Sequence, residues 1–575
     1  YWESKDRSDR RLLFVAGGFL QAIDARTGAP IKSFGKEGLV RFTEAVPRAN
    51  PTGTPGHIFE DLILLGSVTG EGYGSSLGYL RAYNVVTGKL AWVFRTLPVP
   101  GDYGYETWPK EAYKYVGGAN TWGEISIDTK RGIAYFPTGS ATYDFYGADR
   151  IGANLFADCL LAIDARTGKR LWHFQAVHHN IWDYDLCVSP KLMTVRHKGK
   201  LVDVVAQGTK FGFLYVFNRV TGEPLWPIEE RPVPKSDVPG EETYPTKPFP
   251  TWPPPFARQK FTAEDINPYV DPEERAKLRE IVLNTRNEGL FTPLSERGTI
   301  DMPGELGGNN WGGTAGDPET GMLYVRTIDA PTRPVMSQRA RVRTPEGATP
   351  AQMGRSVYAQ HCESCHSADL NGVTSPKELG EDRFKSIMRA GVGAMPAYSE
   401  TTITPQQMDA LMIYILNPAA GAPPRGRGGS PPPPPPPGQT RYYTGYHTWN
   451  ASSGLPVIGP PWSEIVAYNL GEGTIKWRIP FGVVPSLAAK GIKNTGSYHP
   501  TRNGLVVTAG GLLIAGTFSD RTLHAYDKDN GKVLWEKEIE SGPEGIPSVY
   551  QAGGRQYIVF AARTGRIFDN IGRES

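Results

Sequence analysis

The chain has 575 residues and nearly balanced charge, with 62 Lys and Arg against 59 Asp and Glu. This balance gives no indication of a nucleic-acid partner or of a polybasic contact with a membrane, and no apolar run approaches the roughly eighteen residues of a membrane-spanning helix. The 67 Gly, 50 Pro and 11% aromatic residues are typical of many short strands joined by tight turns.

A short phrase recurs six times, each copy running from a small apolar residue through Asp or Asn to a turn glycine. The copies are Ala22–Gly28, Ala82–Gly88, Ala162–Gly168, Val216–Gly222, Ala467–Gly473 and Ala525–Gly531. Asp or Asn can hydrogen-bond to the backbone of its own turn, and Gly accepts the positive φ that the turn needs. Five copies are followed four residues later by Trp, at Trp92, Trp172, Trp226, Trp477 and Trp535.

These phrases predict repeated strand–turn–strand units, in which the Trp wedges between neighbouring sheets. Neighbouring copies are about 55 to 80 residues apart, apart from one longer gap, and this suits the blades of a β-propeller. A β-sandwich with repeated hairpins is the alternative.

Helical signals fill the long gap between the fourth and fifth copies. Thr349–Gln352 and Thr404–Gln407 are capping boxes with Pro at the first helical position, and apolar residues follow Thr404 at helical spacing. Seven prolines at Pro431–Pro437 then predict an extended linker. We therefore expect a small all-α domain inserted into the propeller.

Cys362-Glu-Ser-Cys365-His366 lies in this insertion and is the attachment signature of a c-type haem. The two thiols would form thioethers to the porphyrin, and His366 would bind the iron. Met395, in a Gly-Ala-Met-Pro stretch, is the candidate sixth ligand, although it could instead be a core methionine. A zinc site is the other interpretation of the cysteine pair, but no second Cys or His cluster follows it.

Covalent haem attachment takes place outside the cytoplasm, so the motif predicts a periplasmic or extracellular protein. The chain begins Tyr-Trp-Glu-Ser without a charged and apolar leader, and we expect it to be processed or incomplete at its start. In an oxidising compartment the two remaining cysteines, Cys159 and Cys187, could form a disulfide.

Three stretches outside the insertion carry a family resemblance: Leu171–Asp185, Phe291–Thr299 and Asn309–Gly313. They resemble the quinoprotein dehydrogenases that use pyrroloquinoline quinone (PQQ), particularly the membrane-bound glucose dehydrogenase branch, and the helical module resembles a class I cytochrome c. The resemblance implies an eight-bladed propeller that holds PQQ near its axis, with Ca²⁺ or Mg²⁺ polarising the reactive carbonyl. It also implies that N-terminal blades are missing, either because the chain is incomplete, as we expect, or because the propeller is a shortened one with a damaged cofactor site.

The resemblance assigns the reacting groups position by position. Asp183 would be the general base that removes the hydroxyl proton, and Lys210 would stabilise charge on the reduced quinone. Without the resemblance, Asp183 could be a turn residue and Lys210 a surface lysine.

It assigns the cofactor contacts in the same way. Trp122 would form the floor beneath the quinone, unless it is one more core tryptophan, and Asn310 and Trp311 would belong to a further quinone-contacting segment. Glu71 falls at a metal-ligand position, where a carboxylate suits a hard cation. The second metal-ligand position falls near Ser140, which leaves the coordination shell open.

The expected organisation is an all-β propeller over 1–340 and 441–575, a cytochrome c domain over 345–420 and a Pro/Gly-rich linker over 421–440. The predicted function is a dehydrogenase that oxidises an alcohol or sugar with PQQ and passes electrons through haem to a soluble cytochrome, a membrane quinone or an oxidase chain. Two alternatives are a non-enzymatic electron-transfer protein on a propeller scaffold and a propeller that only binds other proteins.

Overall fold

The computed structural model describes residues 1–44, 46, 48, 54–338, 348–362, 366, 373–392, 395, 397–400, 403–421, 439–498 and 503–563. The chain divides into two compact units. The propeller unit comprises 1–336, 432–441 and 446–575, and the helical unit comprises 337–431 and 442–445.

In each antiparallel sheet of the propeller unit, neighbouring strands are consecutive in the chain. In one sheet the helical insertion separates two such neighbours in sequence. The four-stranded sheets are β1–β4 (Trp2–Glu3, Arg10–Ala16, Phe19–Asp24, Leu39–Arg41), β5–β8 (His57–Phe59, Leu62–Leu65, Leu80–Asn84, Leu90–Phe94), β9–β12 (Ser126–Asp128, Ile133–Pro137, Cys159–Asp164, Arg170–Gln175), β18–β21 (Thr314–Asp317, Met322–Arg326, Glu464–Asn469, Thr474–Pro480) and β22–β25 (Leu505–Val507, Leu512–Thr517, Thr522–Asp527, Val533–Glu538). The smaller sheets are β13–β15 (Lys191–His197, Lys200–Gly208, Leu214–Asn218), β16–β17 (Ile228–Pro232, Thr246–Pro250) and β26–β27 (Gly542–Ala552, Arg555–Arg563). Two helices of this unit are α1 (Pro272–Asn284) and α7 (Pro485–Ala488).

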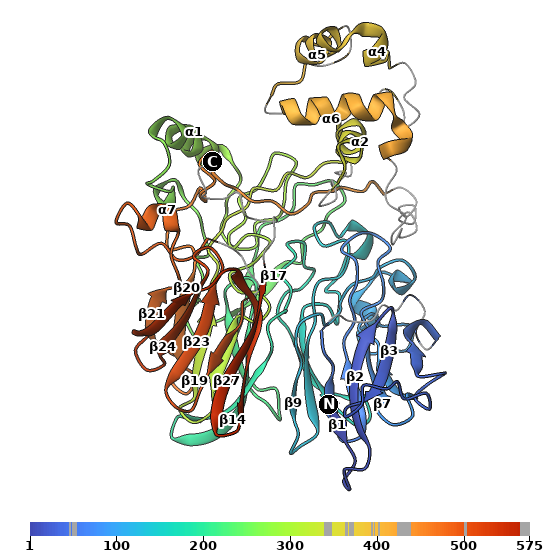
Figure 1. The fold of residues 1–575 in the computed structure, drawn as a ribbon, viewed down its shortest axis with the longest axis vertical. Coiled ribbons are helices and arrows are strands. Elements are labelled where there is room, and N and C mark those ends of the chain that lie inside the picture. Colours follow the sequence, from blue (N-terminus) through green and yellow to red (C-terminus); the bar gives the residue numbers. More distant parts are fainter. Residues whose placement is uncertain are drawn as a thin grey trace. The chain divides into compact units, whose positions relative to one another are not determined.

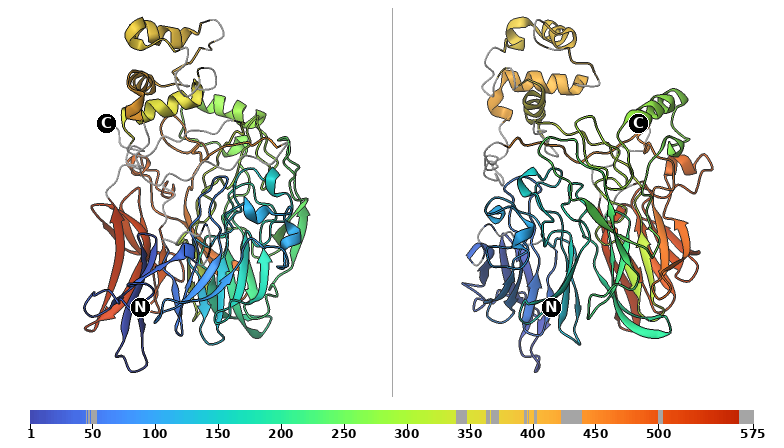
Figure 2. Two further views of the ribbon diagram at one scale, coloured as in Figure 1. Left: turned by 90° about the vertical axis from the view of Figure 1, so that its right-hand side faces the viewer. Right: turned by 180° about the vertical axis from the view of Figure 1, so that it is seen from behind.

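These sheets stand side by side as the blades of a propeller do (Figures 1 and 2). The first strand of one sheet contacts the first strand of the next, in the order β5, β9, β13, β18, β22 and β26. Such a series of innermost strands is the arrangement of a propeller, in which the first strands line the axis. The fold is therefore mostly β and propeller-like, as the sequence predicts, whereas the eight-bladed count stays a prediction.

The repeated phrase occupies the same place in its sheets, the end of a third strand and the turn that follows. In β11, for example, Oδ1 of Asp164 accepts hydrogen bonds from the backbone N–H groups of Arg166 (3.0 Å) and Thr167 (2.9 Å), and Gly168 has a φ of +73°. The prediction of a side-chain-capped turn with a left-handed glycine is confirmed.

The tryptophan that follows the phrase packs on the turn of the next sheet. Trp92 of β8 lies against Gly168, and its Nε1 donates to the carbonyl oxygen of Ala165 at 3.0 Å. A Cβ on Gly168 would lie 2.7 Å from the indole, so this close approach requires glycine. The same contact recurs at Trp172 with Gly222 and at Trp477 with Gly531.

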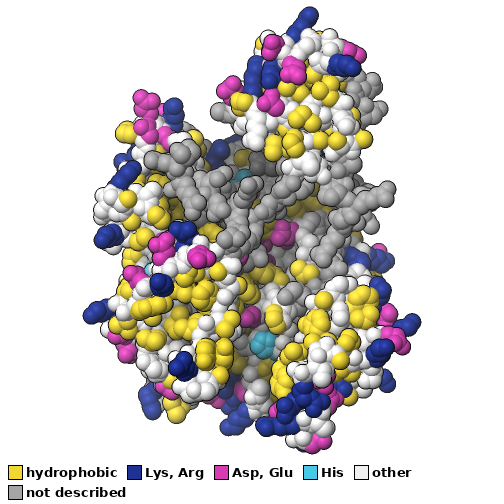
Figure 3. Space-filling view, in the orientation of Figure 1, with side chains coloured by type: hydrophobic (Ala, Val, Ile, Leu, Met, Phe, Trp, Pro, Cys, Tyr) yellow, Lys and Arg dark blue, Asp and Glu magenta, His cyan; other side chains and the backbone are white. Residues whose placement is uncertain are grey.

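Among the described residues, this contact between a tryptophan and the turn glycine of the next sheet is not made at either end of the series of sheets. Within the described residues nothing lies within 4 Å of a Cβ built on Gly28, and Trp535 is 51% exposed. Apolar side chains are also exposed on β27 and on β2, and Figure 3 shows hydrophobic side chains on this face of the molecule.

The helical insertion lies between the second and third strands of one sheet. Residues of β19 pair with β20, for example Met322 with Asn469 and Val325 with Val466, although the insertion separates the two strands in the chain. The sheet therefore closes across the insertion, and the propeller core continues on both sides of it.

The helical unit contains α2 (Pro350–His361), α4 (Pro376–Leu379), α5 (Glu381–Ala390) and α6 (Pro405–Leu416). The capping boxes at Thr349 and Thr404 are both formed, which confirms the two helix starts predicted from the sequence. Helices α2 and α6 pack closely, because Gly354 lets its backbone approach the carbonyl of Ala410. No helix in the described ranges is long and apolar enough to cross a membrane.

Cys159 and Cys187 do not form the disulfide that the sequence left open. Both are buried thiols with no exposed surface. Cys159 lies in β11, and its Sγ donates to the carbonyl of Ala157, while Cys187 lies 3.8 Å from Oδ1 of Asn310.

Candidate functional site

A buried ion pair joins the two residues predicted to carry the chemistry. Lys210 follows β14, and its Nζ lies 2.9 Å from both Oδ2 and the carbonyl oxygen of Asp183. Asp183 is 3% exposed and Lys210 4% exposed. Gly307 packs so tightly on the lysine that a Cβ there would lie 2.6 Å from Lys210. Lys210 is therefore a fixed partner of Asp183, and the surface-lysine alternative is excluded.

A second carboxylate, which the sequence analysis did not single out, completes this pair. Asp185 Oδ2 lies 3.2 Å from Nζ of Lys210 and accepts from Nε1 of Trp122 at 2.9 Å. Its other oxygen accepts from the backbone N–H and the hydroxyl of Ser140, at 2.6 and 2.9 Å. Ser140, assigned by resemblance to a metal position, serves here as a hydrogen-bond donor to Asp185.

Trp122, which the resemblance places beneath the quinone, contacts this cluster through Asp185. Its indole is half-buried and is held at one edge by Asp185, while the Lys210 ammonium lies 5.7 Å from the ring centroid. An aromatic plane held at one edge can stack against a flat ring system, and a neighbouring ammonium can pair with that ring's carbonyl oxygens. Trp122 and Lys210 thus fit a planar quinone.

Tyr446 makes a contact that no local pattern predicts. Its hydroxyl donates to Oδ2 of Asp183 at 2.8 Å, so this oxygen accepts from Lys210 and from Tyr446 together. Among the described residues none hydrogen-bonds Oδ1 of Asp183. The carboxylate is therefore held through one oxygen and presents the other.

The surroundings shift the pKa values of Asp183 and Asp185 in opposite directions. Burial raises the pKa of Asp183 well above its usual range, and the charges of Asp185 and Glu71 add to this against the opposing effect of Lys210. Burial also acts on Asp185, but Lys210 and the hydrogen bonds from Ser140 and Trp122 outweigh it and lower its pKa. Two neighbouring carboxyls whose pKa values are pushed apart are typical of acid–base sites, and Asp183 is the group suited to take a proton.

An aromatic wall stands beside Asp183. It consists of Tyr73, Tyr143, Phe145 and Tyr446, with successive ring centroids 4.9, 5.7 and 5.6 Å apart. The Arg441 guanidinium lies 4.0 Å from the Tyr73 ring. Tyr446 is 36% exposed and the other three rings are 9% or less, so Tyr446 is the ring of this wall that can pack on the C–H face of a substrate presenting its hydroxyl to Asp183.

Asn310 and Trp311, the remaining predicted quinone contacts, follow Gly307 in the same loop. Asn310 is 8% exposed; its amide donates to the carbonyl of Leu306 and its Oδ1 accepts from the backbone N–H of Trp311. Trp311 is half-buried, and no contact joins its ring to Trp122 or Lys210 among the described residues. Cys187 lies between Asn310 and the cluster, since its Sγ is 3.8 Å from Oδ1 of Asn310 and its charge acts on Lys210. The quinone contacts of Asn310 and Trp311 stay predictions.

Among the described residues, only some of the ligands that the predicted divalent cation needs are present. Glu71 is exposed, and its charge acts on the buried carboxyls of Asp183 and Asp144. Oδ2 of Asp144 is buried without a hydrogen-bond partner. Carboxylates suit Ca²⁺ or Mg²⁺, but within the described ranges no three His, Cys, Asp or Glu side chains gather closely enough to hold an ion. No step of the chemistry below uses a cation.

His178 and His179 contact different groups, and His179 has a left-handed backbone conformation with a φ of +47°. His178 lies between Gln175 and Glu230, whereas His179 is fully buried with Nε2 2.7 Å from Glu241. These contacts anchor the segment that leads to Asp183 and do not form a metal site.

The helical unit brings two predicted haem residues into one cluster. Cys362 caps the end of α2 and is 9% exposed, and Met395 packs against the same apolar cluster, which includes Tyr358 and Met408. His366 is half-buried, and its backbone N–H donates to the carbonyl of Cys362 at 3.0 Å. Cys365 lies outside the described residues. The described part therefore fits a haem group that Cys362 would attach and His366 and Met395 would ligate.

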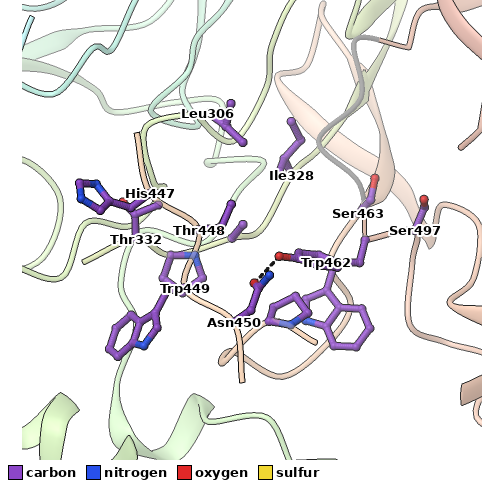
Figure 4. A pocket seen from close by; sticks show the side chains of 14 residues that line it. Leu306, Ile328, Thr332, His447, Thr448, Trp449, Asn450, Trp462, Ser463 and Ser497 are labelled. Carbon is purple, nitrogen blue, oxygen red and sulfur yellow. Dashed lines mark hydrogen bonds between the residues drawn. The ribbon is translucent and has the colours of Figure 1, made fainter. Parts of the chain in front are cut away.

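A pocket lies next to the Tyr446 segment in the propeller unit (Figure 4). It contains about 500 Å³ of empty space, part of it open to solvent, and its labelled lining includes Trp449, Trp462 and His447. His447 directly follows Tyr446, and its Nδ1 lies 3.1 Å from Glu305, which is 1% exposed. None of the predicted site residues lines this pocket, so we do not assign the reaction to it.

Comparison with known families gives a match over most of the chain. The family model "Glucose/ethanol/alcohol dehydrogenase, beta-propeller domain", the PQQ family, matches residues 1–380 and 392–558. This chain belongs to the PQQ β-propeller dehydrogenase family. The model "Cytochrome C oxidase, cbb3-type, subunit III" matches residues 349–415, which cover the haem motif and Met395.

Relatives within this family act on different substrates. The chain is 28% identical over 560 residues to a quinate/shikimate dehydrogenase (quinone) of Acinetobacter baylyi, and 28% identical over 569 residues to quinoprotein glucose dehydrogenase A of Acinetobacter calcoaceticus. Each alignment covers 95% of this chain and 60% of the relative, so the chain spans well under two thirds of their length.

Solved structures of this family share the fold. The quinohemoprotein alcohol dehydrogenase ADHIIG of Pseudomonas putida superposes with a TM-score of 0.56 at 20% identity, over 96% of this chain and 61% of that protein. The propeller fold is thus shared.

Proposed function

We propose that this chain is the catalytic part of a quinohaemoprotein dehydrogenase that works outside the cytoplasm and oxidises an alcohol or a sugar. The observation that carries the proposal is the Asp183 carboxylate, held through Oδ2 by Lys210 and Tyr446 with Oδ1 presented, next to the fixed plane of Trp122. Electrons would leave through the haem of the insertion to a soluble cytochrome, a membrane quinone or an oxidase chain.

The residues divide the work of oxidising a C–OH group. Oδ1 of Asp183 accepts the hydroxyl proton as the C–H bond breaks, and its raised pKa brings this base closer to the operating pH. Lys210 stays protonated, because the charges of Asp183 and Asp185 raise its pKa despite burial. Its ammonium stabilises negative charge that develops above Trp122.

Trp122 would support PQQ from below, with Lys210 and Asn310 at its edge. When bound, the quinone supplies the two-electron acceptor for the substrate hydrogen. Asp185 orients both Trp122 and Lys210, and the aromatic wall excludes water and packs on the carbon skeleton of the substrate.

The wall favours a ring-shaped polyol or sugar over a short linear alcohol. Flat aromatic faces gain most contact from a substrate that has an extended C–H face of its own. Both a cyclic polyol and a sugar are named as substrates of similar proteins, which supports this choice.

A direct test is reduction of the haem by substrate. The whole chain, matured with haem and loaded with PQQ and Ca²⁺, is mixed with a panel of cyclic polyols, sugars and primary alcohols while the visible spectrum is recorded. We expect reduced haem bands with one substrate class in the wild type and none in Asp183→Asn. Reduction by ascorbate alone, with no quinone bound, would instead support an electron-transfer protein on a propeller scaffold.

A further inference from the structure

A fully buried arginine lies deep in the propeller without a counter-ion. Arg326 ends β19 and is 1% exposed. Its Nε and Nη2 have no hydrogen-bond partner, and in the part of the chain that the structure describes no carboxylate lies within ion-pair distance of it. Its backbone N–H donates to the carbonyl of Gly313 at 2.8 Å, and its strand pairs with β20 at Ile465.

The contrast with another buried arginine shows how unusual this is. Arg150 is also fully buried, but its guanidinium donates to Oδ1 of Asn154 and to the carbonyls of Tyr143 and Asn180, at 2.9, 2.9 and 2.6 Å. The Arg150 guanidinium thus makes three hydrogen bonds although its Nε is unpaired, whereas no hydrogen bond from the Arg326 guanidinium is found among the described residues.

Further buried polar atoms without partners belong to the sheet of Arg326 and to segments next to that sheet. Oδ1 of Asn309, Oγ1 of Thr314 and Oε1 of Gln207 are all buried and unbonded among the described residues. Gly208 joins these side chains, because a Cβ there would lie 3.3 Å from Asn309 and 3.6 Å from Thr314. Two neighbouring sheets and the loop before β18 therefore contribute buried polar groups to this part of the propeller.

The positive charge of Arg326 indicates which kind of ligand this buried region binds. Burial lowers the pKa of Arg326 to about 10, so the guanidinium is still charged at neutral pH, and the only group acting in the other direction is Cys187. Water could bridge the amide and hydroxyl oxygens, but it leaves the buried charge uncompensated. A planar guanidinium whose Nε–H and Nη2–H groups are both unpaired can bind a small anion or a carboxylate.

We propose that the Arg326 guanidinium forms a buried anion-binding site in the propeller, with Nε–H and Nη2–H as the donors. The ligand chemistry is a negatively charged oxygen or halide, supplied either by a free inorganic anion or by a carboxylate of the quinone cofactor, which carries three. The site does not depend on the chain oxidising an alcohol, so it can be tested in the protein without substrate.

The first experiment compares thermal unfolding of the whole chain with Arg326→Met. In a buffer whose only anions are large and weakly binding, the variant is expected to unfold at the same temperature as the wild type or higher, because an uncompensated buried charge has been removed. Chloride, phosphate or PQQ should then raise the midpoint of the wild type by several degrees and leave the variant unchanged.

The matched control is Arg150→Met. Removing this guanidinium, which makes three hydrogen bonds, should lower the midpoint in every buffer and leave the response to anions intact. Arg326→Lys, which keeps the charge and loses the planar fork, should show a reduced response. A variant Arg326→Met that loses stability as Arg150→Met does, and responds to anions like the wild type, contradicts the proposal.

The two sources give different patterns. If the anion is inorganic, chloride or phosphate stabilises the protein equally with and without PQQ. If it is a cofactor carboxylate, the affinity for PQQ, measured by retention after filtration, falls at least tenfold in Arg326→Met, and inorganic anions compete with PQQ.

Crystals of the wild type provide a measurement that needs no variant. One is grown with bromide and without PQQ, the other with PQQ. Anomalous density for bromide, or a cofactor carboxylate, within hydrogen-bond distance of Arg326 is the expected result. Water alone beside the guanidinium in both crystals overturns the proposal.

Discussion

The hydroxyl of Tyr446 lies 2.8 Å from Oδ2 of Asp183, a residue 263 positions earlier in the chain. Tyr446 is the first residue of the propeller unit after the helical unit's last segment, residues 442–445. The chain that returns from the insertion thus places a hydrogen-bond donor directly on the proposed general base.

Removing this hydroxyl should change the pH dependence of the reaction. In Tyr446→Phe the ionised form of Asp183 loses one donor, so its pKa rises further and the acid limb of the kcat/KM profile moves to higher pH. Activity should approach that of the wild type at high pH, where Asp183 is ionised. The other charged groups that face Asp183 are Lys210, Asp185, Glu71 and Asp144, and all are unchanged.

Tyr146→Phe is the control for that profile, since its hydroxyl donates to the carbonyl of Pro239 and does not touch Asp183. Its acid limb should coincide with that of the wild type. Superimposable profiles for wild type and Tyr446→Phe would show that the hydrogen bond does not influence the base.

Asp183→Asn should lower kcat by a factor on the order of 10² to 10⁴, because the amide cannot accept the proton. PQQ binding, measured by retention after filtration, should persist, since Trp122 and Asp185 stay in place. Asp164→Asn is the matched control: this turn aspartate is part of the repeated phrase, and its loss should leave kcat unchanged. Full activity in Asp183→Asn would assign the base elsewhere.

Lys210→Met should destabilise the fold by about 3–5 kcal/mol at pH 8, because it leaves two buried carboxyls without their cation. Without Lys210 the folded-state pKa of Asp183 rises further above its unfolded value. Stability is then retained below the unfolded pKa and lost as pH rises through the folded pKa, so the defect should shrink toward pH 4. Urea unfolding at the two pH values measures this, and an equal loss at both would contradict the ion-pair interpretation.

The tryptophans of the repeat should differ sharply in their contribution to stability. Trp92→Ala removes an indole that packs on Gly168 and is 7% exposed, and the expected loss is about 3–5 kcal/mol. Trp535→Ala changes a residue in the same place of the repeat that is 51% exposed, and should cost less than about 1 kcal/mol. Denaturant unfolding of the two variants compares them, and similar losses would refute the docking model.

Met395→Ala should lower the reduction potential of the haem, since a thioether ligand favours ferrous iron. Met388→Ala is the control, because Met388 is a buried core residue of the same cluster, 2% exposed, and its removal should reduce stability while leaving the potential unchanged. Redox titration of the visible spectrum distinguishes the two roles. A potential that does not move in Met395→Ala would make it a core methionine.

Local patterns predicted the features that depend on local interactions. The turn in each copy of the phrase is held by Asp or Asn within the same turn, and the capping boxes at Thr349 and Thr404 satisfy backbone groups three residues away. The family resemblance identified Asp183, Lys210 and Trp122, which the structure places together. The cysteine pair that the sequence left open, Cys159 with Cys187, does not form a disulfide.

Tertiary structure alone decided which groups face these residues. Asp185 was visible two positions after Asp183, but its contacts to Trp122 and Ser140 come from other loops. Tyr446 and Arg326 carry no local signal, because a tyrosine after a linker and an arginine at a strand end are ordinary in sequence. The role of Tyr446 comes from its hydrogen bond to Asp183, 263 residues earlier in the chain. The role of Arg326 comes from its burial without a hydrogen-bond partner for Nε and Nη2 among the described residues. Both features exist only in the folded chain.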